Sequence, residues 1–148
     1  MWLLQISDAI LRAHKREGVS VRVISDDGEA IRSGSDVVKL DKAGVPVLTD
    51  RSACHMHNKF VVVDDTMVIT GSFNWTRSAV VGNQENLLML EGAAGKSRAF
   101  GGRRVELARL FADHFDKMWT QYQASGNSVE VTAKLAAERE AQRGNQWR

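Results

Sequence analysis

The apolar and polar positions in the first third of the chain alternate between helical and extended spacing. Apolar residues between positions 3 and 17 recur with helical spacing ahead of Gly18, which predicts a helix that ends there. Residues 19–25 then alternate apolar and polar side chains, as a strand with one buried face does. A short helix over 34–43 and a short strand over 45–48 follow, and the only proline of the chain suits an edge position in that strand.

The middle of the chain predicts a hairpin and a further strand. Lys59–Val63 and Thr66–Ser72 are rich in β-branched residues and are separated by the turn-forming pair Asp64-Asp65. The apolar run Asn86–Leu90 is a candidate for a buried strand that completes the sheet. These elements predict an α/β fold, with a mixed β-sheet flanked by helices.

The last third predicts a long helix followed by a polar tail. Residues 104–122 place one apolar stripe on a helix face, which predicts packing against the core. The stripe consists of Leu107, Leu110, Phe111, His114, Phe115, Met118, Trp119 and Tyr122. We expect its histidine to lie in the core or at its boundary. Residues 1–122 are therefore assigned to one domain, and 123–148 to a tail that is helical or disordered.

Composition adds little to this picture. The 148 residues, 43% hydrophobic and 26% charged, suit one globular domain. A net charge of +2 favours a phosphate-bearing partner but does not choose between nucleic acid and an anionic lipid surface. The single cysteine, Cys54, excludes an intramolecular disulfide and is either a packing residue or a free thiol.

The most informative chemistry lies in one hairpin-sized segment. It reads His57-x-Lys59, four residues, Asp64, six residues, and Gly71-Ser72-x-Asn74. Residues two apart in a strand share a face, so His57 and Lys59 are expected to point the same way. Asp64 has the opposite parity and lies at the strand end, which favours a structural hydrogen-bonding role over a catalytic one.

These residue types suit the transfer of a phosphoryl group. A neutral imidazole can attack phosphorus and a protonated one can protonate the leaving alkoxide, but His57 cannot do both at once. Lys59 and Asn74 would donate to the non-bridging phosphate oxygens, where charge accumulates in the transition state. Ser72 would add a donor, and Gly71 lets the backbone turn without a Cβ. One motif is therefore half a site.

The chain resembles the phospholipase D superfamily over about residues 3–122. The resemblance rests on His57, Lys59, Asp64, Gly71, Ser72 and Asn74, followed by Trp75 and by Asn83-Gln84-Glu85-Asn86-Leu87. It is closer to the branch with a single motif per chain, which holds mitochondrial cardiolipin hydrolases, Zucchini-type endonucleases and a small bacterial nuclease. The resemblance implies a phosphodiesterase that uses a phosphohistidine intermediate and needs neither a metal nor another cofactor. It also implies that Glu85 accepts a hydrogen bond from the far nitrogen of His57.

Members of this branch pair two chains, so the resemblance implies a homodimer with one composite active site. One His57 would be the nucleophile, and His57 of the partner subunit would protonate the leaving group and later activate water. Two facing imidazoles favour holding a single proton between them, because like charges at close range oppose the second protonation. A bell-shaped pH dependence is therefore expected.

Two phosphodiester substrates fit this chemistry. The first is cardiolipin, hydrolysed to phosphatidic acid, and the sequences GSFNWT and NQENLLML favour it. The second is single-stranded RNA or DNA, for which a basic groove would recruit Lys96, Arg98, Arg103 and Arg104. These cations lie in the glycine-rich segment 92–104, which is expected to be a loop that either faces phosphate or is a solvated insertion. A third hypothesis is that the chain is an inactive, truncated binding module.

A zinc site is the competing hypothesis for the segment around the motif. Cys54, His55 and His57 would supply ligands, since His-x-His places two of them on one strand face. Lys59 on the same face would set a cation beside the metal, so we favour a site without metal. His55 is then a neighbour of the phosphate site or a structural residue.

The chain departs from the family at its start. Members begin with a helix and an apolar strand ahead of the helix predicted here, and mitochondrial members carry a membrane-spanning segment before these. Residues 1–6 are at most a remnant of that strand, so a truncation relative to the family is expected. A place in the mitochondrial outer membrane, with the membrane surface as a partner, follows from the resemblance only, and a cytoplasmic location is the alternative.

Overall fold

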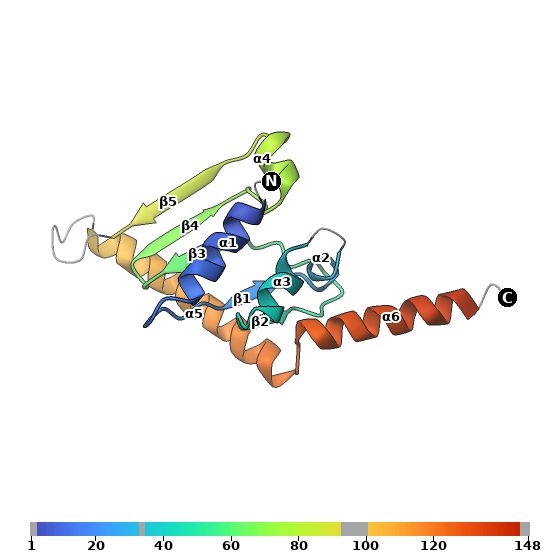
Figure 1. The fold of residues 1–148 in the computed structure, drawn as a ribbon. Coiled ribbons are helices and arrows are strands. Elements are labelled where there is room, and N and C mark those ends of the chain that lie inside the picture. Colours follow the sequence, from blue (N-terminus) through green and yellow to red (C-terminus); the bar gives the residue numbers. More distant parts are fainter. Residues whose placement is uncertain (1–2, 33–34, 93–100, 146–148) are drawn as a thin grey trace. The chain divides into compact units, whose positions relative to one another are not determined.

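The computed structural model describes residues 3–32, 35–92 and 101–145. In chain order the elements are α1 (Leu3–His14), β1 (Val23–Ser25), α2 (Asp27–Ala30), α3 (Val37–Lys42), β2 (Val47–Thr49), β3 (Phe60–Val63), β4 (Met67–Gly71), α4 (Arg77–Val81), β5 (Leu87–Glu91), α5 (Gly101–Ala124) and α6 (Val129–Asn145) (Figure 1). They fall into two units. The hairpin unit contains Asn58–Met118, and the parallel-strand unit contains Leu3–His57 with Trp119–Arg148.

The hairpin unit is built on an antiparallel sheet with the strand order β3-β4-β5. Phe60 pairs with Thr70 at one end of the β3–β4 hairpin, and Val63 pairs with Met67 at the other. Asp64 and Asp65 have φ angles of 50° and 52° in the turn between them, a left-handed conformation that aspartate tolerates better than most residues. Asp64 therefore lies in the turn that sets the hairpin register.

Helix α5 packs on this sheet through aromatic side chains. The ring centroid of Phe60 lies 5.1 Å from that of Phe111 and 6.5 Å from that of Phe115, both in edge-to-face contacts. Leu110 was expected on the same stripe but is 59% exposed, and His114 is exposed as well. At about 100° per residue, Leu110 lies roughly a third of a turn from the buried line of the helix. The apolar stripe is thus narrower than predicted.

Strand β5 is exposed, which corrects the prediction of a buried strand. Leu87, Leu88 and Met89 are 58%, 53% and 61% exposed although they alternate between the two faces of the sheet. Within the described part of the chain β5 pairs with β4 alone, so its other edge carries no strand. An apolar run does not distinguish a central strand from an edge strand, and burial was inferred from hydrophobicity alone.

The parallel-strand unit has its own small core. Strands β1 and β2 are parallel, with Val23 opposite Val47. A buried cluster of Leu40, Val45, Val47 and Val129 joins α3, β2 and α6. The mixed α/β fold class is thus confirmed, with one correction. Among the described residues the strands form two separate sheets rather than the continuous sheet that was expected.

The segment after residue 122 contributes to this core. Val129 and Thr132 are 3% and 5% exposed, and Ser128 bridges to Leu48 of β2. The hydroxyls of Thr49 and Thr132 lie 2.7 Å apart in a buried hydrogen bond. The expected boundary between a domain and a tail at residue 122 remains a prediction about domain organisation, but the first turns of α6 are packed against β2.

Helix α5 begins at Gly101, which corrects part of the predicted loop 92–104. A helix that has already formed extends by one hydrogen bond for each residue added, so two glycines at its start do not prevent the extension. Arg103 and Arg104 therefore lie on a helix, and only their backbone is described. Lys96 and Arg98 lie outside the described residues. Among helices in the described ranges, none is both long and apolar enough to cross a bilayer.

Candidate active site

Lys59 immediately precedes β3, and a hydrogen bond from β4 holds its backbone. The hydroxyl of Thr70 on β4 donates to the carbonyl oxygen of Lys59 at 3.0 Å, next to the pair Phe60–Thr70. The side chain of Lys59 is half-buried. The backbone that carries the Lys59 ammonium group is thus held in place by a hydrogen bond from the neighbouring strand.

Gly71 and Ser72 lie where β4 meets β5. Gly71 pairs with Leu87, and a Cβ at residue 71 would overlap the carbonyl oxygen of Asn86. The backbone N–H of Ser72 donates to that same oxygen at 3.0 Å, and the N–H of Asn86 donates to the Ser72 hydroxyl oxygen at 3.0 Å. A close approach between the strands therefore requires glycine here, in addition to the turn freedom that the sequence suggested.

Glu85 is held by two hydrogen bonds. Ser72 Oγ donates to its Oε2 at 2.5 Å, and Asn83 Nδ2 donates to its Oε1 at 2.9 Å. These two bonds, followed by the positive charge of Lys59, lower the pKa of Glu85 below its ordinary value and outweigh a smaller opposing effect of burial. Glu85 is thus a carboxylate at neutral pH. Asn83 is part of the family motif, but its bond to Glu85 was not predicted from the sequence.

Asn74 follows this junction. Its carbonyl oxygen accepts from the N–H of Thr76 at 2.7 Å, and its neighbours Phe73 and Trp75 stack edge to face at 5.7 Å. Residue 74 is exposed, so its amide is accessible to a ligand. Lys59, Ser72, Asn74 and Glu85 all belong to the hairpin unit.

His57 ends the first of the two chain segments that form the parallel-strand unit, and it is exposed. The next residue, Asn58, belongs to the hairpin unit, where its Nδ2 lies 3.4 Å from His114 Nε2 and 3.8 Å from Met118 Sδ. The hydrogen bond between His57 and Glu85 stays a prediction. In this structure the carboxylate oxygens of Glu85 accept hydrogen bonds from Ser72 and Asn83.

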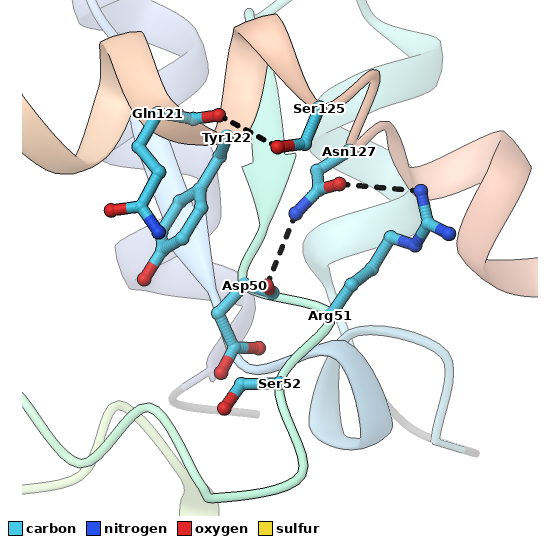
Figure 2. A pocket seen from close by; sticks show the side chains of 7 residues that line it. All are labelled: Asp50, Arg51, Ser52, Gln121, Tyr122, Ser125 and Asn127. Atoms are coloured by element: carbon cyan, nitrogen blue, oxygen red, sulfur yellow. Dashed lines mark hydrogen bonds between the residues drawn. The ribbon is translucent and has the colours of Figure 1, made fainter.

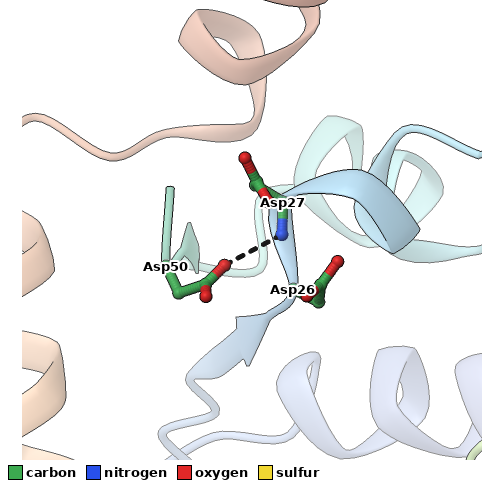
Figure 3. Close-up of side chains that lie close together, drawn as sticks. All are labelled: Asp26, Asp27 and Asp50. Atoms are coloured by element: carbon green, nitrogen blue, oxygen red, sulfur yellow. Dashed lines mark hydrogen bonds between the residues drawn. The ribbon is translucent and has the colours of Figure 1, made fainter. Parts of the chain in front are cut away.

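The residues of the alternative zinc site are not gathered. Within residues 3–32, 35–92 and 101–145, the cluster of potential metal ligands is Asp26, Asp27 and Asp50, whose nearest oxygens lie within 4.8 Å of one another (Figure 3). Cys54 is exposed, and His55 Nδ1 lies 3.1 Å from Asp26 Oδ2.

Hydrogen bonds within the acidic cluster account for much of its geometry. Asp50 Oδ1 accepts from the N–H of Asp27 at 3.0 Å, and the carboxylate of Asp26 accepts from the N–H groups of Glu29 and Met56. Burial, with the nearby charges of Asp26 and Asp27, raises the pKa of Asp50. Carboxylates in such a group could hold a hard divalent cation, yet acidic clusters are common without one.

A polar pocket of about 460 Å³ lies in the parallel-strand unit (Figure 2). Every lining side chain carries a hydrogen-bonding group: Asp50, Arg51, Ser52, Gln121, Tyr122, Ser125 and Asn127. Arg51 Nη1 donates to Asn127 Oδ1 at 3.2 Å, and Asn127 Nδ2 donates to the Asp50 carbonyl at 3.1 Å. The backbone of Arg51 is left-handed, with a φ of 45°, which is uncommon for a residue other than glycine.

Comparison with known proteins places this fold and this motif in one class, the phospholipase D-like proteins. The family described as cardiolipin synthase, PLD-like domain, matches residues 4–119. The chain belongs to this family. It is also similar to the crystal structure of Nuc, a phospholipase D family member from Salmonella typhimurium, with a TM-score of 0.62 and 30% identity over 78% of this chain and 70% of that one.

Relatives named mitochondrial cardiolipin hydrolase share much of the sequence. The protein from Chlamydomonas reinhardtii is 40% identical over 117 residues, which cover 79% of this chain and 47% of that protein. The mouse protein is 37% identical over 118 residues, which cover 80% of this chain and 48% of that protein. The chain thus spans about half the length of these relatives.

Proposed function

We propose that this protein is a phosphodiesterase that hydrolyses cardiolipin to phosphatidic acid through a phosphohistidine on His57. The observation that carries the proposal is the arrangement at the β4–β5 junction, which brings Ser72 and an ionised Glu85 together within the influence of the Lys59 charge. His57 stands two residues before that lysine. The names of the relatives support the lipid substrate, and they also support a mitochondrial location, which we include in the proposal.

The reaction would proceed in two displacements at phosphorus. A ring nitrogen of neutral His57 attacks, the bond from phosphorus to the leaving oxygen breaks, and His57 of the partner subunit gives that oxygen its proton. Water then attacks phosphorus after losing a proton to the partner subunit's His57, and the phosphorus–nitrogen bond breaks. Lys59 and Asn74 would donate to the non-bridging oxygens in both transition states. This scheme requires the homodimer, which is part of the proposal.

Exposed apolar side chains next to the site support a lipid substrate. Trp75 directly follows Asn74, and Leu87, Leu88 and Met89 begin two residues after Glu85. All of them are at least 36% exposed, and an exposed apolar patch on a soluble surface often marks a site of interaction. Acyl chains could lie against this surface while the phosphate reaches the polar residues.

The polar pocket supports a second candidate, an endonuclease for single-stranded nucleic acid. All its lining groups can form hydrogen bonds, Arg51 supplies a cation, and Tyr122 supplies an aromatic ring on which a base could stack. The same catalytic residues would serve this reaction, since both substrates are phosphodiesters.

Hydrolysis assays on both substrates test the proposal. Cardiolipin vesicles and a single-stranded RNA are incubated in EDTA with wild type, with His57→Ala and with His114→Ala, which removes another exposed histidine. We expect cardiolipin cleavage by wild type and His114→Ala and a loss of at least about 10³-fold in His57→Ala, because the nucleophile is gone. Cleavage of RNA alone would favour the endonuclease. Cleavage of neither substrate, or an active His57→Ala, would overturn the proposal.

A further inference from the structure

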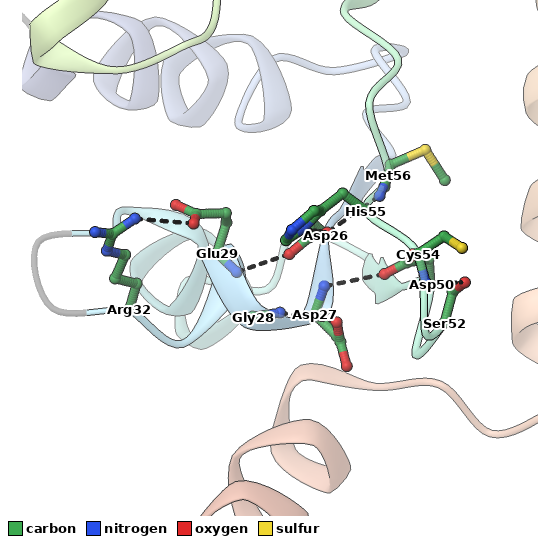
Figure 4. A network of polar contacts seen from close by, with 10 residues as sticks. All are labelled: Asp26, Asp27, Gly28, Glu29, Arg32, Asp50, Ser52, Cys54, His55 and Met56. Carbon is green, nitrogen blue, oxygen red and sulfur yellow. Dashed lines mark hydrogen bonds and ion pairs between the residues drawn. The ribbon is translucent and has the colours of Figure 1, made fainter.

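The carboxylate of Asp26 connects two segments of the parallel-strand unit that are far apart in the sequence. Its Oδ1 accepts from the N–H of Glu29 at 3.0 Å and thereby caps α2. Its Oδ2 accepts from the N–H of Met56 at 3.1 Å and lies 3.1 Å from His55 Nδ1 (Figure 4). Asp26 is only 8% exposed, whereas the side chain of His55 is 82% exposed. We call this set of contacts the Asp26 clasp.

The clasp acts on the backbone that leads directly into His57. Residues 51–57 form neither a helix nor a strand, and all of them except Met56 are exposed. Cys54 N–H donates to Ser52 Oγ at 3.1 Å, which is a local contact within the segment. The two bonds to Asp26, by contrast, join residues about 30 positions apart and anchor the segment to a buried group. An irregular segment keeps one conformation only when such bonds hold it.

The charge state of Asp26 suits this task. Burial by itself would raise the pKa of Asp26, but the hydrogen bonds from Glu29, His55 and Met56 together outweigh it, and the net change is a lower pKa. An ionised carboxylate only accepts hydrogen bonds, so His55 Nδ1 carries the proton in this contact. Bonds to an ionised acceptor are roughly twice as strong as neutral ones.

We propose that Asp26 is a positioning residue that holds the 55–56 backbone and so orients His57 for attack on phosphorus. The proposal rests on the function proposed above for His57. A nucleophile must stand at attack distance and angle, and a misplacement of about 1 Å can cost about 10²-fold in rate. Asp26 touches neither the substrate nor the reacting atoms in this scheme, and it acts through the chain that carries the nucleophile.

The neighbouring aspartate provides a matched control. Asp26→Asn removes the charge and leaves one acceptor oxygen where two were used, so the bonds to α2 and to Met56 cannot both persist. Asp27→Asn makes the same change of charge one residue away. Asp27 Oδ1 accepts from the N–H of Gly28 at 2.9 Å, which is not part of the clasp. Any effect of charge alone on the acidic cluster would appear in both variants.

The first measurement is hydrogen exchange at the Met56 amide in the full chain, which requires no activity. We expect exchange at least about tenfold faster in Asp26→Asn than in wild type, and within about twofold of wild type in Asp27→Asn. Equal exchange of Met56 in wild type and Asp26→Asn would overturn the proposal.

The second measurement is turnover of the phosphodiester substrate by the same three proteins, with melting temperatures recorded alongside. We expect kcat of Asp26→Asn to fall about 10- to 100-fold with KM changed less than about threefold, because Lys59 and Asn74 still bind phosphate. A fall that only follows the unfolded fraction, or an equal fall in Asp27→Asn, would also overturn it. Inactive wild type would overturn the proposed function instead, and the exchange of Met56 would still decide whether Asp26 holds the segment.

Discussion

Ser72 forms hydrogen bonds with two neighbouring residues through its backbone and its hydroxyl. Its backbone N–H donates to Asn86, its Oγ accepts from Asn86, and its hydroxyl proton goes to Glu85. The sequence suggested that this hydroxyl would donate to phosphate, and that role remains a prediction. In this structure the proton is used on Glu85, so Ser72 orients a carboxylate and completes the β4–β5 pairing.

The Ser72 bond predicts a measurable change in the pKa of Glu85. Ser72→Ala removes the largest of the influences that lower this pKa, so the pKa should rise toward the ordinary glutamate value. Because the pKa of Glu85 is lower in the folded state, its contribution to stability is present above the unfolded-state pKa and is lost as pH falls through the folded-state pKa. The Ser72→Ala protein should therefore lose less stability on acidification than wild type. A carboxyl NMR titration measures the shift. Ser125→Ala is the control, because the Ser125 hydroxyl donates to the Gln121 carbonyl oxygen, and it should leave the pKa of Glu85 unchanged.

Gly71 predicts a steric effect in addition to a conformational one. In Gly71→Ala the new Cβ would overlap the Asn86 carbonyl oxygen, which is backbone and cannot turn away, so β5 must move. We expect a loss of about 2–4 kcal/mol in urea unfolding, in the range of overpacked sites. Gly18→Ala is the comparison, because its φ of 76° is strained but nothing lies within 4 Å of its Cβ, and it should cost about 1 kcal/mol. Equal losses would argue against a clash at residue 71.

At the scale of elements, local signals explain which predictions are confirmed. The β-branched runs and the Asp64-Asp65 pair located the hairpin to within a residue at each strand end. The helix predicted over 34–43 survives only as Val37–Lys42, and α2 was missed although Asp26 and Glu29 have the spacing of a capped helix start. The exposure of β5 was beyond reach because an edge position depends on which strands pair, and that is decided by contacts between distant residues.

The start of α6 predicts a stability effect in a segment that reads as a polar tail. Thr132 Oγ1 donates to the Ser128 carbonyl and accepts from Thr49, which is fully buried. Thr132→Val keeps the shape but leaves the Thr49 hydroxyl without this partner, so urea unfolding should show a loss of about 1–3 kcal/mol. Val131→Thr, on a more exposed neighbour, should stay within about 0.5 kcal/mol. A neutral Thr132→Val would indicate that the hydrogen bond between Thr49 and Thr132 does not stabilise the fold.

At the scale of the whole molecule, the proposed composite site predicts how activity depends on the mixing of wild-type and variant chains. When wild type and His57→Ala chains are refolded together in equal amounts, a site that needs both histidines survives only in wild-type pairs, and about a quarter of the activity should remain. Chains that act alone would retain about half. The measurement is activity against the fraction of wild-type chain, which should follow a square law, and a straight line would contradict the shared site.

The family was accessible from the sequence because it rests on a few positions with strict chemistry, and the fold class was accessible because it rests on the spacing of apolar residues. His57, Lys59 and Asn74 define the motif without any knowledge of packing. The contacts made around the motif, such as Asn83 with Glu85 or Asp26 with Met56, depend on the path of the chain between elements. No periodicity encodes such paths, which is why the supporting residues were missed.

The boundary between the two units falls inside the motif, between His57 and Asn58. The proposed nucleophile, His57, therefore belongs to one unit, and Lys59, which would bind the phosphate, belongs to the other. Because the two residues are two positions apart in the chain, their Cα atoms stay within about 7 Å of each other. Attack on phosphorus and binding of the phosphate anion would therefore depend on two different structural units. Substitutions in the core around Val45 would then affect the reaction through the position of His57, and substitutions around Phe60 would affect it through the position of Lys59.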